Sequence, residues 1–332
     1  MKILVTGGYG FIGSNFIRYM LNKHPDVEIV NLDALTYAGN IENLKDIENE
    51  ARYRFVHGRV EDAERLEEAL EGVEAVVHFA AESHVDRSIL DAAPFIKTNV
   101  MGTQVLLNSA LKHGIKKFVH ISTDEVYGAL GEEGLFKETD PFRPRSPYSA
   151  SKAAADLLVQ SYFTTYGLPV CIARPSNNYG PYQFPEKLIP LMITNLIEGK
   201  KVPVYGQGLN VRDWLFVEDN CRAIDLILER GKPGEAYNIG GKCEKHNIEV
   251  VREVLKIMGQ SEEMVEFVPD RPGHDFRYAL DNTKIESELG WNPATSFEEG
   301  IRRTVEWYMN NSHWWKPLKE RLQKESKGFW SK

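Results

Sequence analysis

The stretch that most constrains the fold of this chain lies near its amino terminus, where three glycines join an apolar run to a helical pattern. Residues 2–6 read Lys-Ile-Leu-Val-Thr, Gly7, Gly10 and Gly13 follow, and apolar residues recur with helical spacing over 14–21. Glycines at such positions permit a tight turn, allow the backbone to approach a pyrophosphate, and let helix and strand pack closely. The pattern therefore predicts a strand–turn–helix unit that binds a dinucleotide.

An acidic residue supports this prediction and indicates which dinucleotide is bound. The apolar run 28–32 ends at Asp33, twenty positions beyond Gly13, where an acid accepts a hydrogen bond from a ribose 2′-hydroxyl. An acid at this point should repel a 2′-phosphate. We therefore expect the cofactor to be NAD rather than NADP.

Strand-like and helical patterns continue to alternate after this unit. Further apolar runs, separated by helical patterns, lie at 53–57, 75–80, 117–121 and 170–173. Such alternation predicts an α/β fold with a parallel, doubly wound sheet of the Rossmann type. We expect an NAD-binding domain over 1–176, with return segments near 211–221 and 236–240, and a smaller interleaved substrate lobe over 177–332.

The composition is that of a negatively charged protein with enough apolar residues for a core. The 332 residues are 42% apolar and carry a formal charge of −8, from 40 Lys and Arg against 48 Asp and Glu, which argues against general affinity for nucleic acids or membrane surfaces. Cys171, Cys221 and Cys243 lack metal-ligand spacing, so we expect reduced thiols, no metal site and a cytoplasmic location. No apolar run reaches the roughly 18 residues of a membrane span, and the opening strand leaves no room for a signal peptide.

The run 117–121 leads directly into a group of reactive side chains. Thr123, Asp124 and Glu125 follow it, at the carboxyl end of a predicted strand. Open α/β sheets bind their ligands at this end of the strands. We therefore expect a hydroxyl and two carboxyls to face a ligand here.

A second reactive group lies at the start of a predicted helix. Ser146 is the predicted N-cap, and Pro147 suits the first helical position. Tyr148 and Lys152 are four residues apart and share a face of the helix. An ammonium near a phenol favours the phenolate. We expect the two groups to form one catalytic site.

The glycine motif and the Tyr-x-x-x-Lys spacing resemble the short-chain dehydrogenase/reductase superfamily, in its extended, sugar-nucleotide branch. The resemblance implies that Tyr148 takes a proton from a sugar hydroxyl while hydride passes to NAD. It also implies that Lys152 lowers the pKa of the tyrosine and holds the nicotinamide ribose, and that Thr123 is the hydroxyl partner of the tyrosine.

The acid pair Asp124-Glu125 narrows the resemblance to the dTDP-glucose 4,6-dehydratases, because simple epimerases of this branch carry small residues there. Further stretches that resemble this family are 33–40, 80–86, 176–182, 212–214, 237–241 and 270–274. Oxidation at C4 of the hexose acidifies the C5 proton, so a base must remove it and an acid must protonate the departing 6-hydroxyl. The resemblance implies that Glu125 is the base and Asp124 the acid.

Two physical conditions accompany these roles. Asp124 must be neutral to donate a proton, and both burial and a nearby like charge raise the pKa of a carboxyl. Adjacent residues of a regular strand face opposite ways. The chain must therefore turn at Asp124 and Glu125 if both are to reach the sugar, and Gly128 makes such a turn plausible.

The resemblance also implies the binding residues. Expected cofactor contacts are Gly7, Gly10, Phe11, Ile12, Gly13, Asp33, Thr36, Val60, Ala80, Ala81, Thr98, Tyr148, Lys152 and Asn178. Expected contacts of the dTDP-glucose substrate are Ser83, His84, Thr123, Asn177, Lys187, Leu188, Pro203, Tyr205, Arg212, Asn247, Arg271, His274 and Tyr308. For His84, a loop histidine satisfied by its neighbours is an equal alternative. The family usually has an Asp–hydrophobic pair at the adenine, whereas this chain has Arg59-Val60; Arg59 cannot accept a hydrogen bond but could stack on the base.

Other functions stay open on the sequence alone. The nearest are a 4,6-dehydratase of another nucleotide sugar, a 4-epimerase and a decarboxylase; Asp124-Glu125 argues against the last two. A non-catalytic sensor of NAD or a nucleotide sugar would not need Thr123, Tyr148 and Lys152 intact. The long helical patterns at 91–113 and 148–166 resemble the helix pairs of a four-helix homodimer contact, so we expect a homodimer.

Overall fold

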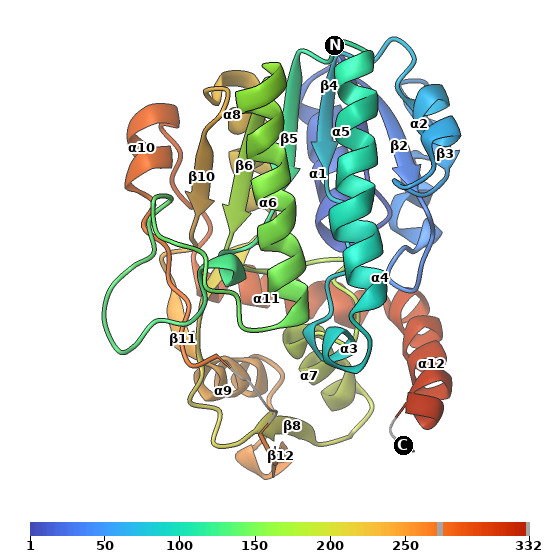
Figure 1. The fold of residues 1–332 in the computed structure, drawn as a ribbon. Coiled ribbons are helices and arrows are strands. Elements are labelled where there is room, and N and C mark those ends of the chain that lie inside the picture. Colours follow the sequence, from blue (N-terminus) through green and yellow to red (C-terminus); the bar gives the residue numbers. More distant parts are fainter. Residues whose placement is uncertain (271–274, 330–332) are drawn as a thin grey trace.

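A computed structural model describes residues 1–270 and 275–329. Its centre is a seven-stranded parallel sheet with the strand order β10-β6-β5-β4-β1-β2-β3 (Figure 1). The strands are β1 (Lys2–Thr6), β2 (Glu28–Asp33), β3 (Tyr53–His57), β4 (Ala75–His78), β5 (Lys117–Ile121), β6 (Val170–Pro175) and β10 (Ala236–Ile239). The strand order reverses between β1 and β4, so the predicted doubly wound Rossmann-type fold is confirmed.

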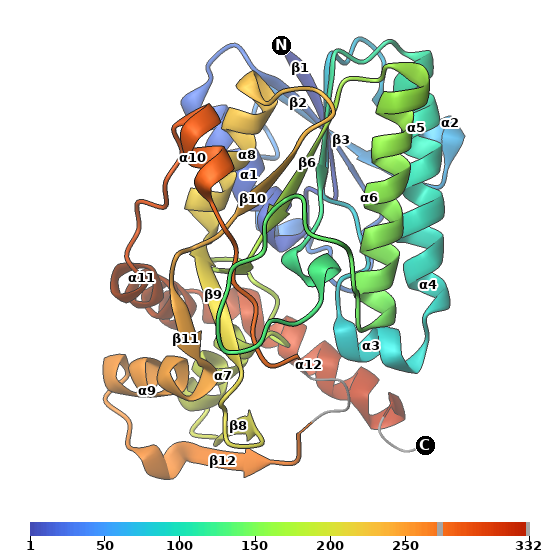
Figure 2. The same ribbon diagram turned by 60° about the vertical axis from the view of Figure 1, so that its left-hand side comes forward.

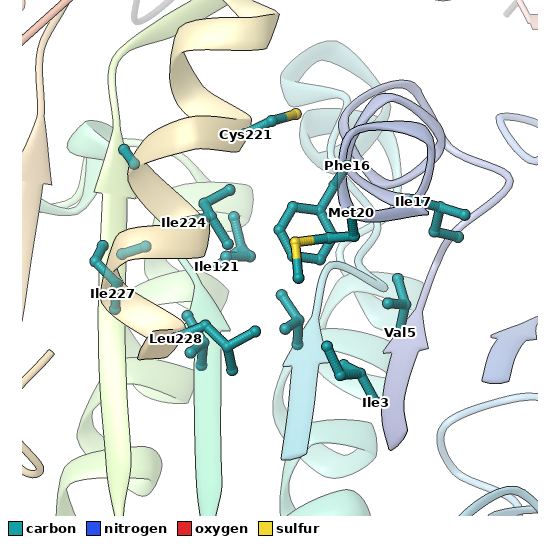
Figure 3. Close-up of a cluster of buried hydrophobic side chains, with 14 of the residues drawn as sticks. Ile3, Val5, Phe16, Ile17, Met20, Ile121, Cys221, Ile224, Ile227 and Leu228 are labelled. Carbon is teal, nitrogen blue, oxygen red and sulfur yellow. The ribbon is translucent and has the colours of Figure 1, made fainter. Parts of the chain in front are cut away.

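Helices cover both faces of this sheet, as Figure 2 shows. One face packs against α1 (Phe11–Lys23), α8 (Val217–Arg230) and α10 (Thr283–Leu289), and the other against α2 (Ala63–Ala69), α5 (Thr103–Lys112) and α6 (Pro147–Tyr166). On the first face, Phe16 and Met20 of α1 and Ile224 and Leu228 of α8 belong to one buried cluster with Ile121 of β5 (Figure 3). Burial of apolar area on both faces is the main force that holds the layers together.

The remaining chain forms a smaller lobe with its own core. Its strands are β7 (Asn177–Tyr179), β9 (Val211–Phe216) and β11 (Glu244–His246) in one sheet, and β8 (Val202–Tyr205) and β12 (Val265–Val268) in another. Its helices are α7 (Leu188–Ile197), α9 (Asn247–Ile257), α11 (Phe297–Asn310) and α12 (Ser312–Phe329). Aromatic residues of α11 and α12, including Trp314 and Trp315, pack into this second core.

The two lobes exchange chain. Strand β10 pairs with β6, and α8 covers the large sheet. The predicted return segment 211–221 joins the first lobe only in its helical half. Its strand half, β9, pairs with β7 and β11 in the small sheet instead. Every residue of β9 is buried, a pattern typical of central parallel strands, and the pattern alone does not say which sheet the strand joins. The domain boundary near 176 stays a prediction.

The segment 91–113, predicted as one long helix, consists of three consecutive pieces: α4 (Ala93–Phe95), the π-helix η2 (Ile96–Gly102) and α5 (Thr103–Lys112). Shorter pieces elsewhere are α3 (Val85–Leu90), η1 (Ile41–Ile47), η3 (Asp124–Tyr127) and η4 (Glu262–Met264). A π-helical turn has i→i+5 hydrogen bonds, and a 3.6-residue apolar pattern does not reveal it. Within 1–270 and 275–329, no helix combines the length and the apolar character needed to cross a membrane.

Candidate active site

A cavity of about 250 Å³ opens at the carboxyl ends of the central strands. Its walls come from the turn after β1, the ends of β2, β4 and β5, the start of α6 and the segment before α7. Of the predicted cofactor contacts, all but Asn178 line it: Gly7, Gly10, Phe11, Ile12, Gly13, Asp33, Thr36, Val60, Ala80, Ala81, Thr98, Tyr148 and Lys152. One fold feature, the edge where the strands end, thus brings together residues that are far apart in sequence.

The glycine turn has the close backbone approaches that a dinucleotide cradle requires. Gly7 has a φ of +73°, and a Cβ there would lie 2.7 Å from the backbone nitrogen of Ala80. A Cβ on Gly13 would lie 2.4 Å from the carbonyl oxygen of Gly7. Helix α1 has Gly10 at its N-cap and no side-chain cap, so its positive end is presented to the cavity by backbone alone. These features fit the pyrophosphate of NAD.

Asp33 closes the cradle at the end of β2. It is buried, and its two oxygens accept from the backbone N–H groups of Tyr9 and Leu35, both at 2.8 Å. Burial raises the pKa of Asp33, and the two backbone hydrogen bonds oppose this. Arg59 and Val60 line the same cavity.

Helix α6 delivers Tyr148 and Lys152 to the floor of the cavity. Ser146 and Ser149 form a reciprocal capping box and Pro147 occupies the first turn, so the predicted helix start is confirmed. Both reactive side chains are buried. The Nζ of Lys152 donates to the carbonyl oxygen of Ile121 at 2.7 Å, which fixes the ammonium against the end of β5.

Electrostatics in this floor depend mainly on burial. Burial lowers the pKa of Lys152 to about 8, and the Asp156 carboxylate opposes this. Burial raises the pKa of Tyr148; the charges of Glu125 and Asp124 add to the increase, and a hydrogen bond with Thr123 opposes it. Both carboxyls are therefore close enough to the phenol to affect its ionisation.

The chain turns immediately after β5, which satisfies the geometric condition set by the sequence. Thr123 is the N-cap of η3, and its hydroxyl accepts from the backbone N–H of Glu125 at 3.3 Å and donates to Asp124 Oδ1 at 3.2 Å. Gly128 ends the turn with a φ of +90°, and a Cβ there would lie 2.5 Å from the carbonyl oxygen of Arg143. The two acids thus lie in a 3₁₀ turn rather than on opposite faces of a strand.

Asp124 has the ionisation that a general acid requires. Burial raises its pKa to about 8, and the charges of Glu125 and Asp213 contribute further. Across the described residues, Asp124 Oδ2 has no hydrogen-bond partner. At neutral pH this carboxyl is therefore mostly protonated, as a general acid must be. Asp124 is almost fully buried and is not among the residues that line the cavity.

The predicted substrate contacts are divided between the cavity and the small lobe. Ser83 and Lys187 line the cavity, and Lys187 Nζ donates to the carbonyl oxygen of Ser83 at 3.3 Å. His84 caps α3, and its Nε2 lies 3.7 Å from a carboxylate oxygen of Glu186. Leu188 begins α7 beside them.

Other predicted contacts lie on the strands of the small lobe. Asn177 and Asn178 form β7; Asn178 accepts from Asn220 at 2.9 Å, and among the described residues Asn177 Oδ1 has no partner. Arg212 on β9 is buried, with its guanidinium 4.6 Å from the ring centroid of Tyr278. Strand β8 carries Pro203 and the exposed Tyr205, and Asn247 begins α9.

Tyr308 differs from the other predicted contacts. Its side chain is fully buried in the second core, and its hydroxyl donates to the carbonyl oxygen of Gln183. It does not line the cavity, so the contacts seen here give it a packing role. Arg271 and His274 lie outside the described residues.

The cavity wall also contains residues that sequence reasoning did not assign to the site, among them Tyr37, Glu82 and Glu186. The Arg87 guanidinium lies 3.9 Å from the ring centroid of Tyr37 and 3.4 Å from an oxygen of Glu186. Tyr37 and Glu82 belong to stretches that resemble the family, but no spacing rule assigns them a role. Glu186 becomes recognisable only when α3 and the segment before α7 are placed together.

One cluster outside the cavity has ligand types that could hold a metal ion: His24, Asp225 and Glu229. Lys23 Nζ donates to Asp225 at 2.6 Å, and His24 Nε2 lies 3.0 Å from the same carboxylate. These contacts pair the buried Asp225 carboxylate of α8 with the end of α1 and its C-cap residue.

Fold and site together define an NAD-dependent enzyme of the extended, sugar-nucleotide branch of the short-chain dehydrogenases/reductases. A family model described as GDP-mannose 4,6 dehydratase matches residues 4–304. The dTDP-glucose 4,6-dehydratase of Streptomyces niveus is 53% identical over 323 residues, which cover 96% of each chain. The chain belongs to the dTDP-glucose 4,6-dehydratase family.

Solved structures agree with this assignment. The dTDP-glucose 4,6-dehydratase DesIV of Streptomyces venezuelae, crystallised with NAD and TYD bound, has a TM-score of 0.94 and 53% identity, covering 96% of this chain and 100% of that one. A UDP-glucose 4-epimerase of Thermotoga maritima has a TM-score of 0.88 and 33% identity, covering 94% and 100%. The fold is thus shared across the branch, while the higher identity is with the dehydratases.

Proposed function

We propose that the protein converts dTDP-glucose into dTDP-4-dehydro-6-deoxyglucose by oxidation at C4, loss of water across C5 and C6, and reduction at C6. The observation that carries the proposal is that η3, which contains Asp124 and Glu125, packs against helix α6, which carries Tyr148, and that both carboxyls raise the pKa of this phenol. NAD fits the cradle of Gly7, Gly13 and Asp33, and when bound it accepts a hydride from C4 and returns it to C6.

Tyr148 acts in the oxidation step by taking the proton of the C4 hydroxyl. Its burial raises its pKa, so the phenolate needs stabilising partners. The Thr123 hydroxyl lowers the pKa through its hydrogen bond, and Lys152 places an ammonium one helical turn away, where its charge favours the phenolate. These three residues therefore make the C4 hydroxyl a proton donor to the protein.

The acid pair acts in the elimination step. Glu125 removes the C5 proton, which the C4 ketone has acidified. Asp124, protonated at neutral pH because burial raises its pKa to about 8, gives its proton to the departing 6-hydroxyl. Elimination needs both a base and an acid at the same pH, and the raised pKa of Asp124 suits it to the role of the acid.

The choice of nucleotide rests on the small lobe. Arg212 would bind a diphosphate oxygen, Lys187 would add a second cation, and Tyr205 with Pro203 would offer a surface to the thymine ring. Purified protein is incubated in parallel with dTDP-glucose and with UDP-, CDP- and GDP-hexoses, and the alkaline absorbance of the keto product is followed. Turnover of dTDP-glucose alone supports the proposal, and turnover of only a non-thymidine sugar contradicts it.

Replacement of the base tests the mechanism. Glu125→Gln should retain bound NAD and the oxidation step but block both exchange of the C5 hydrogen with solvent and loss of water, by on the order of 10²–10⁴ in rate. Glu133→Gln, an exposed change in the following loop, is the matched control and should leave both steps unchanged. Wild-type dehydratase activity in Glu125→Gln would show that Glu125 is not the base.

The protein acts as a cytoplasmic homodimer in this proposal. Helices η2–α5 and α6 lie side by side (Figure 1) and expose large apolar side chains, among them Ile96, Met101 and Leu157. An apolar face of this kind is typical of a protein–protein contact, and two copies would form a four-helix contact. Light scattering should give a dimer mass, and Leu157→Glu should give a monomer; an unchanged mass for that variant would contradict this interface.

A further inference from the structure

A buried charged pair lies between the two catalytic groups. Arg174 on β6 donates through Nε to Asp156 Oδ2 on α6 at 2.9 Å, and both side chains are almost fully buried. Asp156 follows Lys152 by one helical turn on the same face of α6. Its charge raises the pKa of Lys152 against the effect of burial. The pair is thus joined to the helix that carries the phenol and the ammonium.

The same arginine also holds the turn that carries the acid pair. Arg174 Nη1 donates to the hydroxyl of Tyr127 at 2.7 Å, and Tyr127 is the last residue of η3. The Tyr127 hydroxyl in turn donates to Asn238 Oδ1 on β10 at 2.8 Å. One guanidinium therefore connects α6 to the far end of the turn that begins with Asp124.

Aromatic rings restrict the movement of this connection. The Tyr127 ring stacks on Phe136 with centroids 5.0 Å apart, and the Arg174 guanidinium lies 4.8 Å from the ring centroid of Phe142. The backbone N–H of Arg143 donates to the carbonyl oxygen of Val126 at 3.0 Å. The loop after η3 thus folds back over the arginine and closes it off from water.

Stability alone does not account for a charged pair at this position. Removing two charges from water is costly, and well-packed apolar residues of similar volume often replace a buried pair without loss of stability. Apolar side chains would not fix the orientation of their neighbours. A planar guanidinium does, because it sets the angle and distance of each hydrogen-bond partner. Such fixed geometry matters where two catalytic groups must reach the same hexose at defined distances and angles.

We propose that Arg174, Asp156 and Tyr127 are positioning residues that fix the acid turn η3 relative to helix α6. The inference rests on the proposed function, because it assigns elimination to η3 and oxidation to α6. The start of η3 is held independently by β5, and the start of α6 by its capping box. Loss of the connection therefore loosens the end of η3 and slows elimination more than oxidation.

Tyr127→Phe is the sharpest test, because it removes one hydroxyl and keeps the stacked ring. Rapid mixing with dTDP-glucose separates the two steps: reduced nicotinamide absorbance reports oxidation, and keto-product formation with C5 deuterium exchange reports elimination. We expect oxidation within about threefold of wild type and elimination slower by on the order of tenfold to a hundredfold, so that reduced cofactor accumulates during turnover.

Two further variants keep the test independent of simple unfolding. Tyr162→Phe is the matched control; it removes a hydroxyl that donates to Asn108 at 2.5 Å, on the same α6 but away from Arg174, and should change neither step. Arg174→Lys keeps the charge without the forked geometry and should reproduce the Tyr127→Phe effect. In the double variant the two effects should not add, because both break one connection.

The outcomes separate this inference from the proposed function. Equal slowing of both steps in Tyr127→Phe, or a fall in melting temperature with unchanged rates, overturns the positioning role. Additive effects in the double variant overturn it as well. Failure of wild-type protein to turn over dTDP-glucose would instead overturn the proposed function, and it would be seen before any variant is compared.

Discussion

Replacement of Asp124 by Asn should stabilise the folded protein while it abolishes the acid. Burial raises the pKa of Asp124 from an ordinary value of 3.8 to about 8, so folding at neutral pH requires this carboxyl to take up a proton. Asn has nearly the same volume, cannot ionise and needs no proton. The catalytic acid is thus a site at which stability is given up for function.

The magnitude follows from proton linkage. Between pH 3.8 and about 8 the unfolded chain binds fewer protons at Asp124 than the native protein, so the free energy of unfolding of wild type falls by about 1.4 kcal/mol for each pH unit. This contribution is fully present below the lower pKa and is lost as pH rises through the upper one, and the loss amounts to about 4 kcal/mol at pH 7. The Asp124→Asn variant has no ionisable group at this position, so its free energy of unfolding does not fall with pH for this reason.

Urea unfolding of both proteins between pH 5 and pH 9, followed by tryptophan fluorescence, measures the difference. The free energy of unfolding of the variant minus that of wild type should increase by about 1.4 kcal/mol per pH unit up to about pH 8 and then level off. Asp26→Asn, an exposed change, should give a difference that does not vary over this range. Parallel pH curves for Asp124→Asn and wild type would refute the assignment of a buried, neutral acid.

Three other outcomes are expected. The rate of water loss should decline above about pH 8, where Asp124 loses its proton, as a pH–rate profile would show. Gly7→Ala should reduce the NAD that co-purifies, measured by absorbance, because its Cβ would lie 2.7 Å from the Ala80 nitrogen; Gly199→Ala, with a similar φ of +68° and open space around it, should retain NAD. Lys152→Met should slow the oxidation step by at least about 10²-fold in single-turnover kinetics, with the NAD content checked in parallel.

Signals confined to a few neighbouring residues were readable from the sequence. The glycine turn, the acid at position 33 and the cap at Ser146 each depend on local geometry, and the structure places all three as predicted. The large sheet followed from alternation, because parallel strands buried on both faces and amphipathic helices leave different patterns. The motifs that resemble one family extended these signals to residues whose roles no local rule supplies.

Features that depend on contacts distant in sequence were not readable. The pattern could not show that β9 joins the small sheet or that η2 is a π-helix, because both depend on what packs against them. Asp213 raises the pKa of Asp124 from a strand in the other lobe, and no spacing in the sequence connects the two residues. The general acid could be named from the sequence, but the reason it stays protonated could not.

The active site therefore depends on two kinds of information. Local sequence decides which groups are present: the N-cap at Thr123 turns the chain, and the cap at Ser146 starts the helix that carries Tyr148. Their relative position is decided by a residue that touches neither group, because Arg174 lies 47 positions from Tyr127 and 18 from Asp156 in the chain. A change at Arg174 would leave the residues of both catalytic motifs intact and would still slow elimination more than oxidation.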